Sequence, residues 1–355
     1  MNLLYYITSH GFGHAVRTAA IANSFSPSVD ITFRTNLPES FFREEMKRPY
    51  RLLPAEFDCG CVQLDGVSVD IDSTLKKYAT IAKRNASLLQ TEVQLCNEMK
   101  IDCIVSDITP FAFEVASCAS IPSVAVSNFT WFDVYNDYCP QHPWFKRHLE
   151  KIKEQYSLAT LLLSLYPSLN MGYFKQIKHV PVVGRVGENK RSKLSHFYNF
   201  DQQKKIGLIY TGNYGLENVR WKRLEQFKDW EFFGVYPISQ APQNFHLVKK
   251  RDFRYQDLSA SADIILCKLG YGVTSESMLN GIPLVFLPRE NFAEYPVLKK
   301  EVLSLGIGRE LSTDSFLNLR WGEILKMAET KTEQKVASKN GAMVCAREIE
   351  QIAKR

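Results

Sequence analysis

Short runs of apolar residues alternate with longer amphipathic segments along the chain of 355 residues. Most runs are continuous and are bounded by Gly, Pro or Asp, which is typical of strands buried on both faces of a parallel sheet. They predict strands at residues 3–8, 30–34, 101–106, 123–127, 205–210, 230–235, 262–267 and 283–287. Helices are expected between the strands, for example at residues 15–25, 73–99 and 217–227.

This alternation predicts an α/β protein with two doubly wound, Rossmann-like domains, since the chain is longer than one core usually fills. The polar, basic segment 184–193 has no apolar period and is expected to link them. We place an N-terminal domain at residues 1–185 and a C-terminal domain at residues 200–330. A helix is expected from residue 322 to about residue 339.

A second amphipathic helix is expected at residues 341–355, and we predict that it crosses back to the N-terminal domain. The alternative is that it packs only on its own domain. Its apolar stripe consists of Ala342, Val344, Cys345, Ile349 and Ile352.

A glycine-rich turn follows the strand at residues 262–267 and is expected to open a helix. Gly270 and Gly272 would let backbone N–H groups approach an anion, and the positive end of the helix dipole would point at the same place. Glu276 lies one turn further, where a carboxylate can accept hydrogen bonds from ribose hydroxyls. The segment therefore indicates a nucleotide diphosphate site, with an ordinary strand-to-helix turn as the alternative. It reads Lys268, Leu269, Gly270, Tyr271, Gly272, Val273, Thr274, Ser275, Glu276.

A second glycine-rich turn follows the first predicted strand and carries two histidines, His10 and His14. In open α/β sheets ligands bind outside the carboxyl ends of the strands, so both imidazoles are expected in the cleft. His14 would lie in the first helical turn, where it is suited to accept a proton near neutral pH. The alternative is that both histidines cap or pack a tight turn.

The composition is that of a globular protein, with 45% hydrophobic and 23% charged residues. No apolar run reaches the roughly 18 residues of a membrane span. Because neither a basic leader nor a small-residue cleavage site precedes the first strand, we expect a cytoplasmic protein. The net charge of +6 is compatible with an acidic ligand or peripheral contact with an anionic membrane, but it is too small and dispersed to predict nucleic-acid binding.

No metal site or cofactor is expected. Most of the eight cysteines stand singly among apolar residues and are expected to be reduced core residues. Cys59 and Cys61 are too closely spaced for a CxxC motif, so we interpret them as structural. The only DxD string, at Asp70 and Asp72, lies in the N-terminal domain and indicates a loop or a helix cap.

Both glycine-rich motifs resemble those of GT-B glycosyltransferases, most closely bacterial MurG-like proteins related to the N-terminal, glycosyltransferase-like half of plant L-arabinokinase. The hallmarks of that group are an HGxGHxxR start and a KxGYGxxSE segment, and both are present. Residues 106–110, 127–131 and 288–298 resemble the same group. The matches span residues 1 to about 321, and the resemblance implies the GT-B fold, with two Rossmann-like domains that face each other across a cleft.

The resemblance implies that His14 is the acceptor-activating base or an acceptor-binding group, and that Asp107 orients it. The alternative for Asp107 is an N-cap ahead of Pro110. Acceptor binding is expected of His10, Gly11, Phe12, Gly13, Arg17, Asn128 and Trp131.

The resemblance also implies that Glu276 binds the ribose, whereas Phe253 and Tyr255 either flank the nucleobase or pack in the core. Many GT-B transferases bind the donor sugar with an acidic residue followed by Gln. Here Glu294 and Tyr295 occupy that place, so the amide is missing. Donor binding is expected of Gly212, Asn213, Phe253, Tyr255, Lys268, Gly270, Tyr271, Gly272, Val273, Thr274, Ser275, Glu276, Arg289 and Glu294.

The implied reaction is an inverting, metal-independent transfer of a hexosyl or N-acetylhexosaminyl unit from a nucleotide sugar, with a UDP-sugar favoured, to a hydroxyl acceptor. His14 would deprotonate the acceptor, while the turn at residues 270–273 and Lys268 or Arg289 stabilise the leaving diphosphate. Two alternatives stay open. A nucleotide-sugar 2-epimerase or hydrolase would need extra carboxylates in the cleft, and a non-catalytic nucleotide-sugar-binding protein would not need His14.

Overall fold

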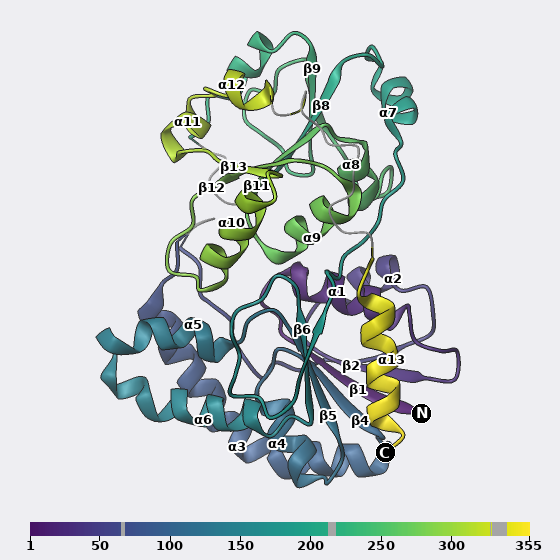
Figure 1. Cartoon of the computed structure of the whole chain (residues 1–355), viewed down its shortest axis with the longest axis vertical. Helices are drawn as coiled ribbons and strands as arrows, with labels where there is room; N and C mark the ends of the chain where they lie inside the picture. The colour runs from purple at the N-terminus through teal and green to yellow at the C-terminus, as the bar shows by residue number, and fades with distance from the viewer. Residues whose placement is uncertain (65–67, 212–217, 327, 329–338) are drawn as a thin grey trace.

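The computed structural model describes residues 1–64, 68–211, 218–326, 328 and 339–355, which contain two parallel sheets. The first sheet has the strand order β3-β2-β1-β4-β5-β6-β7 and the second the order β10-β9-β8-β11-β12-β13. The chain forms one sheet after the other, and its last helix returns to the first half (Figure 1). The predicted doubly wound α/β architecture is confirmed.

Thirteen helices and strands and two short 3-10 helices are present in the described part of the first half. They are β1 (Asn2–Ile7), α1 (Phe12–Ala22), β2 (Asp30–Arg34), α2 (Glu39–Glu45), β3 (Arg51–Leu53), α3 (Ile71–Glu98), β4 (Cys103–Asp107), α4 (Phe111–Cys118), β5 (Ser123–Ser127), α5 (Trp131–Tyr138), η1 (Cys139–Gln141), η2 (Pro143–Phe145), α6 (Lys146–Ser157), β6 (Leu161–Leu165) and β7 (Ile177–Val180).

The second half begins inside the predicted linker, where α7 starts. The elements are α7 (Arg191–Tyr198), β8 (Lys205–Tyr210), η3 (Trp221–Gln226), β9 (Trp230–Gly234), β10 (Phe245–Leu247), α8 (Tyr255–Ser261), β11 (Ile264–Lys268), α9 (Tyr271–Asn280), β12 (Leu284–Leu287), α10 (Glu294–Ser304), β13 (Gly308–Glu310), α11 (Thr313–Leu317), α12 (Gly322–Leu325) and α13 (Ala342–Ala353).

All eight predicted strands are present with small shifts at their ends, and β3, β6, β7, β10 and β13 were not predicted. Four of these five lie at the edges of the sheets, where short strands carry few apolar residues. The leucines of β6 directly follow α6 and are equally good helix formers. Only a 3-10 helix, η3, forms in the described part of the helix predicted at residues 217–227, and most of the helix predicted at residues 322–339 lies outside the described residues.

Both faces of the first sheet are covered, because successive side chains of a strand point to opposite sides. Tyr5 belongs to the apolar cluster that α1, α2 and α13 cover. Its neighbours Leu4 and Tyr6 belong to the cluster under α3 and α4. In the second sheet, Cys267 faces α9 and α10, while Leu266 faces α11 and the segment around η3. The two sheets therefore each have a core of their own.

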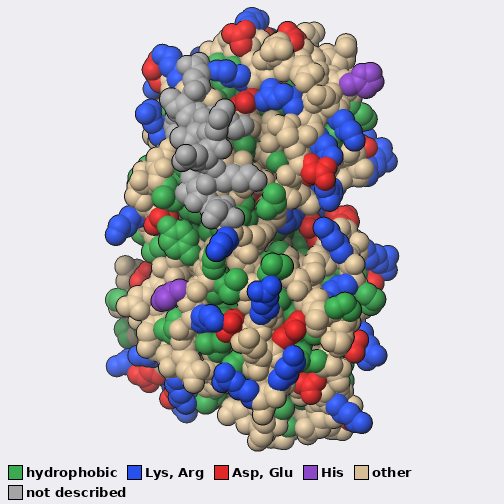
Figure 2. Space-filling model, turned by 45° about the vertical axis from the view of Figure 1, so that its right-hand side comes forward, with side chains coloured by type: hydrophobic (Ala, Val, Ile, Leu, Met, Phe, Trp, Pro, Cys, Tyr) green, Lys and Arg blue, Asp and Glu red, His purple; other side chains and the backbone are tan. Residues whose placement is uncertain are grey.

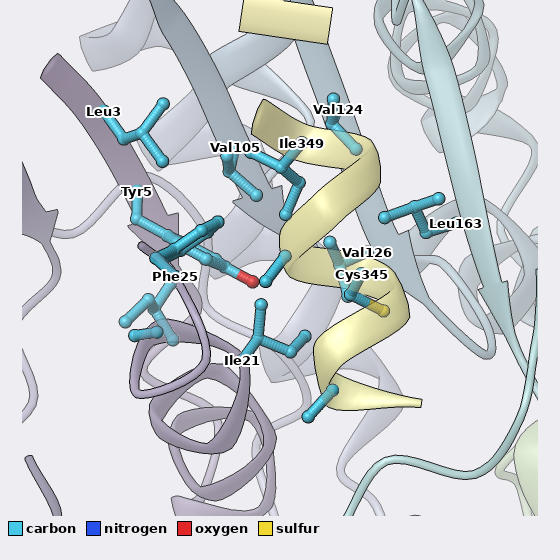
Figure 3. Close-up of a cluster of buried hydrophobic side chains, with 14 of the residues drawn as sticks. Leu3, Tyr5, Ile21, Phe25, Val105, Val124, Val126, Leu163, Cys345 and Ile349 are labelled. Carbon is cyan, nitrogen blue, oxygen red and sulfur yellow. The ribbon is translucent and has the colours of Figure 1, made fainter. Parts of the chain in front are cut away.

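Helix α13 packs on the first sheet, although it follows the second half in sequence. Cys345 and Ile349 lie in one apolar cluster with Tyr5 and Val124, and Figure 3 shows them directed at this sheet. The N–H of Gly341 donates to the carbonyl of Val182 at 2.8 Å, just before α13 begins. The helix completes the layer that α1 begins on this face of the sheet.

On the face shown in Figure 2, Lys and Arg side chains are spread over both halves of the molecule and form no single basic stripe. A nucleic-acid backbone would require such a stripe. Among the residues that the structure describes, no helix combines the length and the apolarity that crossing a membrane requires.

We expect deletion of residues 341–355 to destabilise the first domain and loosen domain closure, because it uncovers the apolar face under α13. Hydrogen exchange should show lost protection in β1, β4 and β5. Deletion of residues 354–355 alone removes only exposed residues and serves as the control. Lost protection confined to residues 200–330 would contradict this role of α13.

Candidate active site between the two domains

A cavity of about 650 Å³ lies where the two sheets face each other. Its walls include the turn between β1 and α1 and the turn between β11 and α9. A Cβ added to Gly272 in the second turn would lie 3.9 Å from the Cα of Gly13 in the first. The two glycine-rich motifs, about 260 residues apart in sequence, therefore meet across one cavity.

The first turn positions its histidines through an unusual backbone conformation. Gly11 has a φ of 77°, in the left-handed region that glycine adopts without steric cost. The chain leaves β1, turns at Gly11 and enters α1 at Phe12. His10 consequently lies before the helix and His14 in its first turn, and both line the cavity.

His14 is held by a buried carboxylate at the end of β4. Its Nδ1 lies 2.8 Å from Oδ1 of Asp107. A protonated Nδ1 would donate to this carboxylate, which only accepts hydrogen bonds, whereas Nη2 of Arg17, which only donates, also lies 3.0 Å from Nδ1. Although burial alone would raise it, Arg17 and His14 hold the pKa of Asp107 below its usual value. The pair has the form of a base with a carboxylate behind it.

Arg17 is bound to the same carboxylate. Its Nε and Nη2 donate to the two oxygens of Asp107 at 2.6 and 2.5 Å, and its Nη1 donates to Oδ1 of Asn128 at 2.6 Å. The amide of Asn128 donates across the cleft to Glu294 at 2.7 Å. Arg17 and Asn128 were expected to bind the acceptor. Both are buried, and these groups form a network that joins the two domains. Arg17 also lines the cavity, whereas Asn128 does not.

His10 differs from His14 in its surroundings. Burial, with His14, Arg289 and Lys268 nearby, lowers the pKa of His10 to about 3. Its Nδ1 accepts a hydrogen bond from the N–H of Cys61 at 3.2 Å, so this imidazole is neutral near neutral pH. Trp131 packs edge-on against it, with ring centroids 5.2 Å apart. Trp131 was expected to bind the acceptor, but it is fully buried behind the histidines and does not line the cavity.

On the opposite wall, α9 points its N-terminus into the cavity. The first intrahelical bond is donated by Thr274 to the carbonyl of Gly270, which leaves the preceding amides without intrahelical partners. A Cβ added at Gly270 would meet nothing within 4 Å, so open space lies against this turn. Lys268 lines the cavity beside it. Amides, dipole and cation together suit an anionic ligand.

Glu276 is buried on α9 and lines the same cavity. Arg185 donates to its Oε1 at 2.7 Å and also to Glu45 of α2 at 2.8 Å. Burial raises the pKa of Glu276, and Arg185 partly offsets that rise. Oε2 has no hydrogen-bond partner among the described residues. One acceptor oxygen is therefore left for a ligand that donates a hydrogen bond.

No protein-family model matches the chain. Among curated proteins, the chain is 29% identical to the L-arabinokinase of Arabidopsis thaliana over 357 residues, which are 98% of this chain and 34% of that protein. The chain thus spans about a third of the length of this relative.

Solved structures match the chain over nearly its whole length. The glycotransferase of kitacinnamycin matches with a TM-score of 0.65 and 16% identity over 99% of each chain. MurG of Acinetobacter baumannii matches with a TM-score of 0.59 and 13% identity over 99% of each chain. The chain has the GT-B fold. A UDP-GlcNAc 2-epimerase of Neisseria meningitidis, bound to UDP-GlcNAc, matches with a TM-score of 0.56 and 14% identity over 100% of this chain and 99% of that one.

Most of the predicted donor-site residues line the GT-B cleft, and five are found elsewhere or not described. Phe253 packs on Phe197 and Tyr198, because α7 brings these rings beside it. Thr274 and Ser275 face away from the cavity within α9, and the hydroxyl of Ser275 donates to a backbone carbonyl. Gly212 and Asn213 lie outside the described residues. The predicted residues on the cavity wall are His10, Gly11, Phe12, Gly13, His14, Arg17, Tyr255, Lys268, Gly270, Tyr271, Gly272, Val273, Glu276, Arg289 and Glu294.

Two groups of site residues were missed. Arg185 lies in the predicted linker, where nothing in the sequence separates it from neighbouring basic residues. Glu56 and Asp58 lie in an irregular segment before α3 that has no motif. Asp58 accepts hydrogen bonds from Thr8 and Thr109, and burial raises its pKa. Both carboxylates line the cavity. In contrast, Asp70 caps α3 through the N–H of Ser73, as predicted.

We expect Arg17→Met to destabilise the protein by about 3–5 kcal/mol, because it leaves the carboxylate of Asp107 buried without its cation. Chemical denaturation measures the change. The double variant R17M/D107N buries no unpaired charge and should be more stable than R17M alone. A loss below about 1 kcal/mol, the size typical of an exposed ion pair, would show that Arg17 is not structural.

Proposed function

We propose that this GT-B protein transfers a glycosyl unit, of hexosyl or N-acetylhexosaminyl type, from a nucleotide sugar to a hydroxyl acceptor. The observation that carries the proposal is the single cavity that joins the His14–Asp107 pair of one domain to the N-terminus of α9 and Glu276 of the other. A base for an acceptor and a cradle for a nucleotide diphosphate are the two halves of such a reaction.

In the proposed reaction His14 accepts the acceptor's proton at Nε2 as the hydroxyl oxygen attacks the anomeric carbon. Asp107 keeps the Nδ1 proton in place and stabilises the imidazolium that forms. Arg17 keeps Asp107 ionised without occupying Nε2. A single displacement of this kind inverts the configuration at the anomeric carbon.

The leaving group is a nucleoside diphosphate, with UDP favoured. The amides of the first turn of α9, the helix dipole and Lys268 would stabilise its developing negative charge. Because these groups all belong to the chain, the scheme requires no metal ion. The free Oε2 of Glu276 would accept a hydrogen bond from a ribose hydroxyl.

A second candidate is a nucleotide-sugar 2-epimerase or hydrolase. The carboxylates of Glu56, Asp58 and Glu294 in the cavity favour it, because proton transfer at C2 needs additional acids or bases. One of the solved structures with this fold is such an epimerase. Product analysis separates the candidates. Transfer yields free nucleotide and a glycosylated acceptor, whereas epimerisation yields an isomeric nucleotide sugar.

A thermal-shift screen with UDP, GDP and dTDP sugars tests the proposal and identifies the base. A ligand at 100 times its Kd stabilises the folded state by about 2.7 kcal/mol. No shift with any nucleoside diphosphate sugar would contradict the proposed function.

We expect Glu276→Gln to weaken nucleotide binding by about 1.5–3 kcal/mol, because it removes a charge-assisted acceptor while it keeps the shape of the side chain. Calorimetry with the preferred nucleotide measures the change. Glu45→Gln removes the other carboxylate bound to Arg185, and Glu45 does not line the cavity. This control should bind the nucleotide nearly as the wild type does. Unchanged binding in E276Q would remove Glu276 from the donor site.

We expect His14→Ala to reduce turnover about 10²- to 10⁴-fold, the usual contribution of a positioned general base. Donor binding should stay nearly intact, since Glu276 and α9 belong to the other domain. His10→Ala is the matched control and should cost less turnover. If His10→Ala is the more damaging change, the roles of the two imidazoles are reversed. A full retention of turnover in both variants favours a different chemistry.

A further inference from the structure

Arg289 is a buried cation for which the described residues provide no counter-ion. Its side chain lines the cavity and is 9% exposed. The guanidinium carbon lies 3.6 Å from the ring centroid of Phe292, and Nε has no hydrogen-bond partner. None of the ion pairs among the described residues includes Arg289. Glu294, the carboxylate whose charge acts on Arg289, accepts a hydrogen bond from Asn128 instead.

Burying an unpaired charge costs more free energy than a cation–π contact contributes. Burial lowers the pKa of Arg289, and Glu294 offsets only part of that effect. A buried, perturbed ionisable group in a cleft is a candidate for binding a ligand of opposite charge. Since the guanidinium forms part of the cavity wall, the missing partner is an anion in the cavity.

The strand register places Arg289 relative to the diphosphate cradle. Lys268 at the end of β11 pairs with Leu287 at the end of β12. Gly270 and Arg289 each follow two residues later, in the loops at the ends of these two neighbouring strands. On the other side of β11, Tyr210 ends β8 near Glu276 and Arg185. A donor with its ribose near Glu276 and its diphosphate at α9 would therefore place its sugar at Arg289.

The charged groups that act on this part of the cavity wall are mostly cations, with Glu294 as the carboxylate that acts on Arg289. Arg289 and Lys268 both lower the pKa of His10, and both act on Cys61, so the two cations face the same wall of the cavity. His10 and Cys61 are themselves neutral there because burial opposes the ionisation of each. This end of the cavity therefore favours a group with at least one negative charge.

We propose that the donor sugar carries a carboxylate, as in a nucleoside diphosphate uronate, and that Arg289 binds that carboxylate. The inference rests on the proposed function and changes its hexosyl unit to a hexuronosyl unit, the acid form of the same sugar. Arg289 belongs to the domain that holds the nucleotide cradle, so the anion belongs to the donor and not to the acceptor. A guanidinium binds a carboxylate through two parallel hydrogen bonds, a geometry that lysine does not reproduce.

Calorimetry with UDP, UDP-glucose and UDP-glucuronate tests the proposal. If another base gives the largest thermal shift, the corresponding diphosphate, hexose and uronate of that base are used. The wild-type protein should bind the uronate about 10- to 100-fold more tightly than the neutral hexose donor. Arg289→Gln should abolish that preference and leave the affinity for UDP unchanged, which also shows that the variant folds. Arg289→Lys should retain part of the preference.

Three results would overturn the inference. Equal affinity of the wild type for the uronate and hexose donors would show that the protein has no site for the carboxylate. A weaker affinity of R289Q for UDP itself assigns Arg289 to the diphosphate. Binding of methyl glucuronide to the UDP-loaded protein, if it depends on Arg289, would show that the carboxylate belongs to the acceptor. Absence of binding by any nucleoside diphosphate contradicts the proposed function, whereas nucleotide binding without a carboxylate preference contradicts this inference alone.

Discussion

Arg17 and Asp107 form an ion pair with almost no access to solvent, and the geometry of the cleft depends on it. The carboxylate orients His14, while the guanidinium continues through Asn128 to Glu294 on the other domain. Each group is costly to bury alone and is stable because the others are present. The network therefore fixes one imidazole and ties its position to that of the second domain.

A similar arrangement operates at the other end of the cleft, where Arg185 lies between Glu276 on α9 and Glu45 on α2. Both ends of the cavity thus hold charged groups from both domains. Helix α13 adds apolar contacts with the first sheet. The proposed nucleotide binding at Glu276 and the proposed acceptor chemistry at His14 would take place within one framework of contacts between the two domains. Domain closure is the motion that such a framework would control.

The sequence predicted the fold well where the signal was local. Continuous apolar runs identified the central strands, since a strand buried on both faces needs them along its whole length. The sequence did not predict short edge strands such as β10, because these strands bury few apolar residues. In the cleft, the glycine-rich motifs led to His14 and Glu276. Arg185 and Asp58 were missed because each acts through partners that are distant in the chain.

By itself the sequence determined two α/β halves and the two turns, with His14 and Glu276 on them, because strand and helix periods, glycines and helix starts are properties of neighbouring residues. Only the tertiary structure decided which polar groups are bound to other side chains and which remain available to a ligand. Arg17, expected at the acceptor, is bound to Asp107, whereas Arg289 packs on Phe292 and forms no ion pair among the residues that the structure describes. That distinction depends on which side chains the folded sheets bring within hydrogen-bond distance.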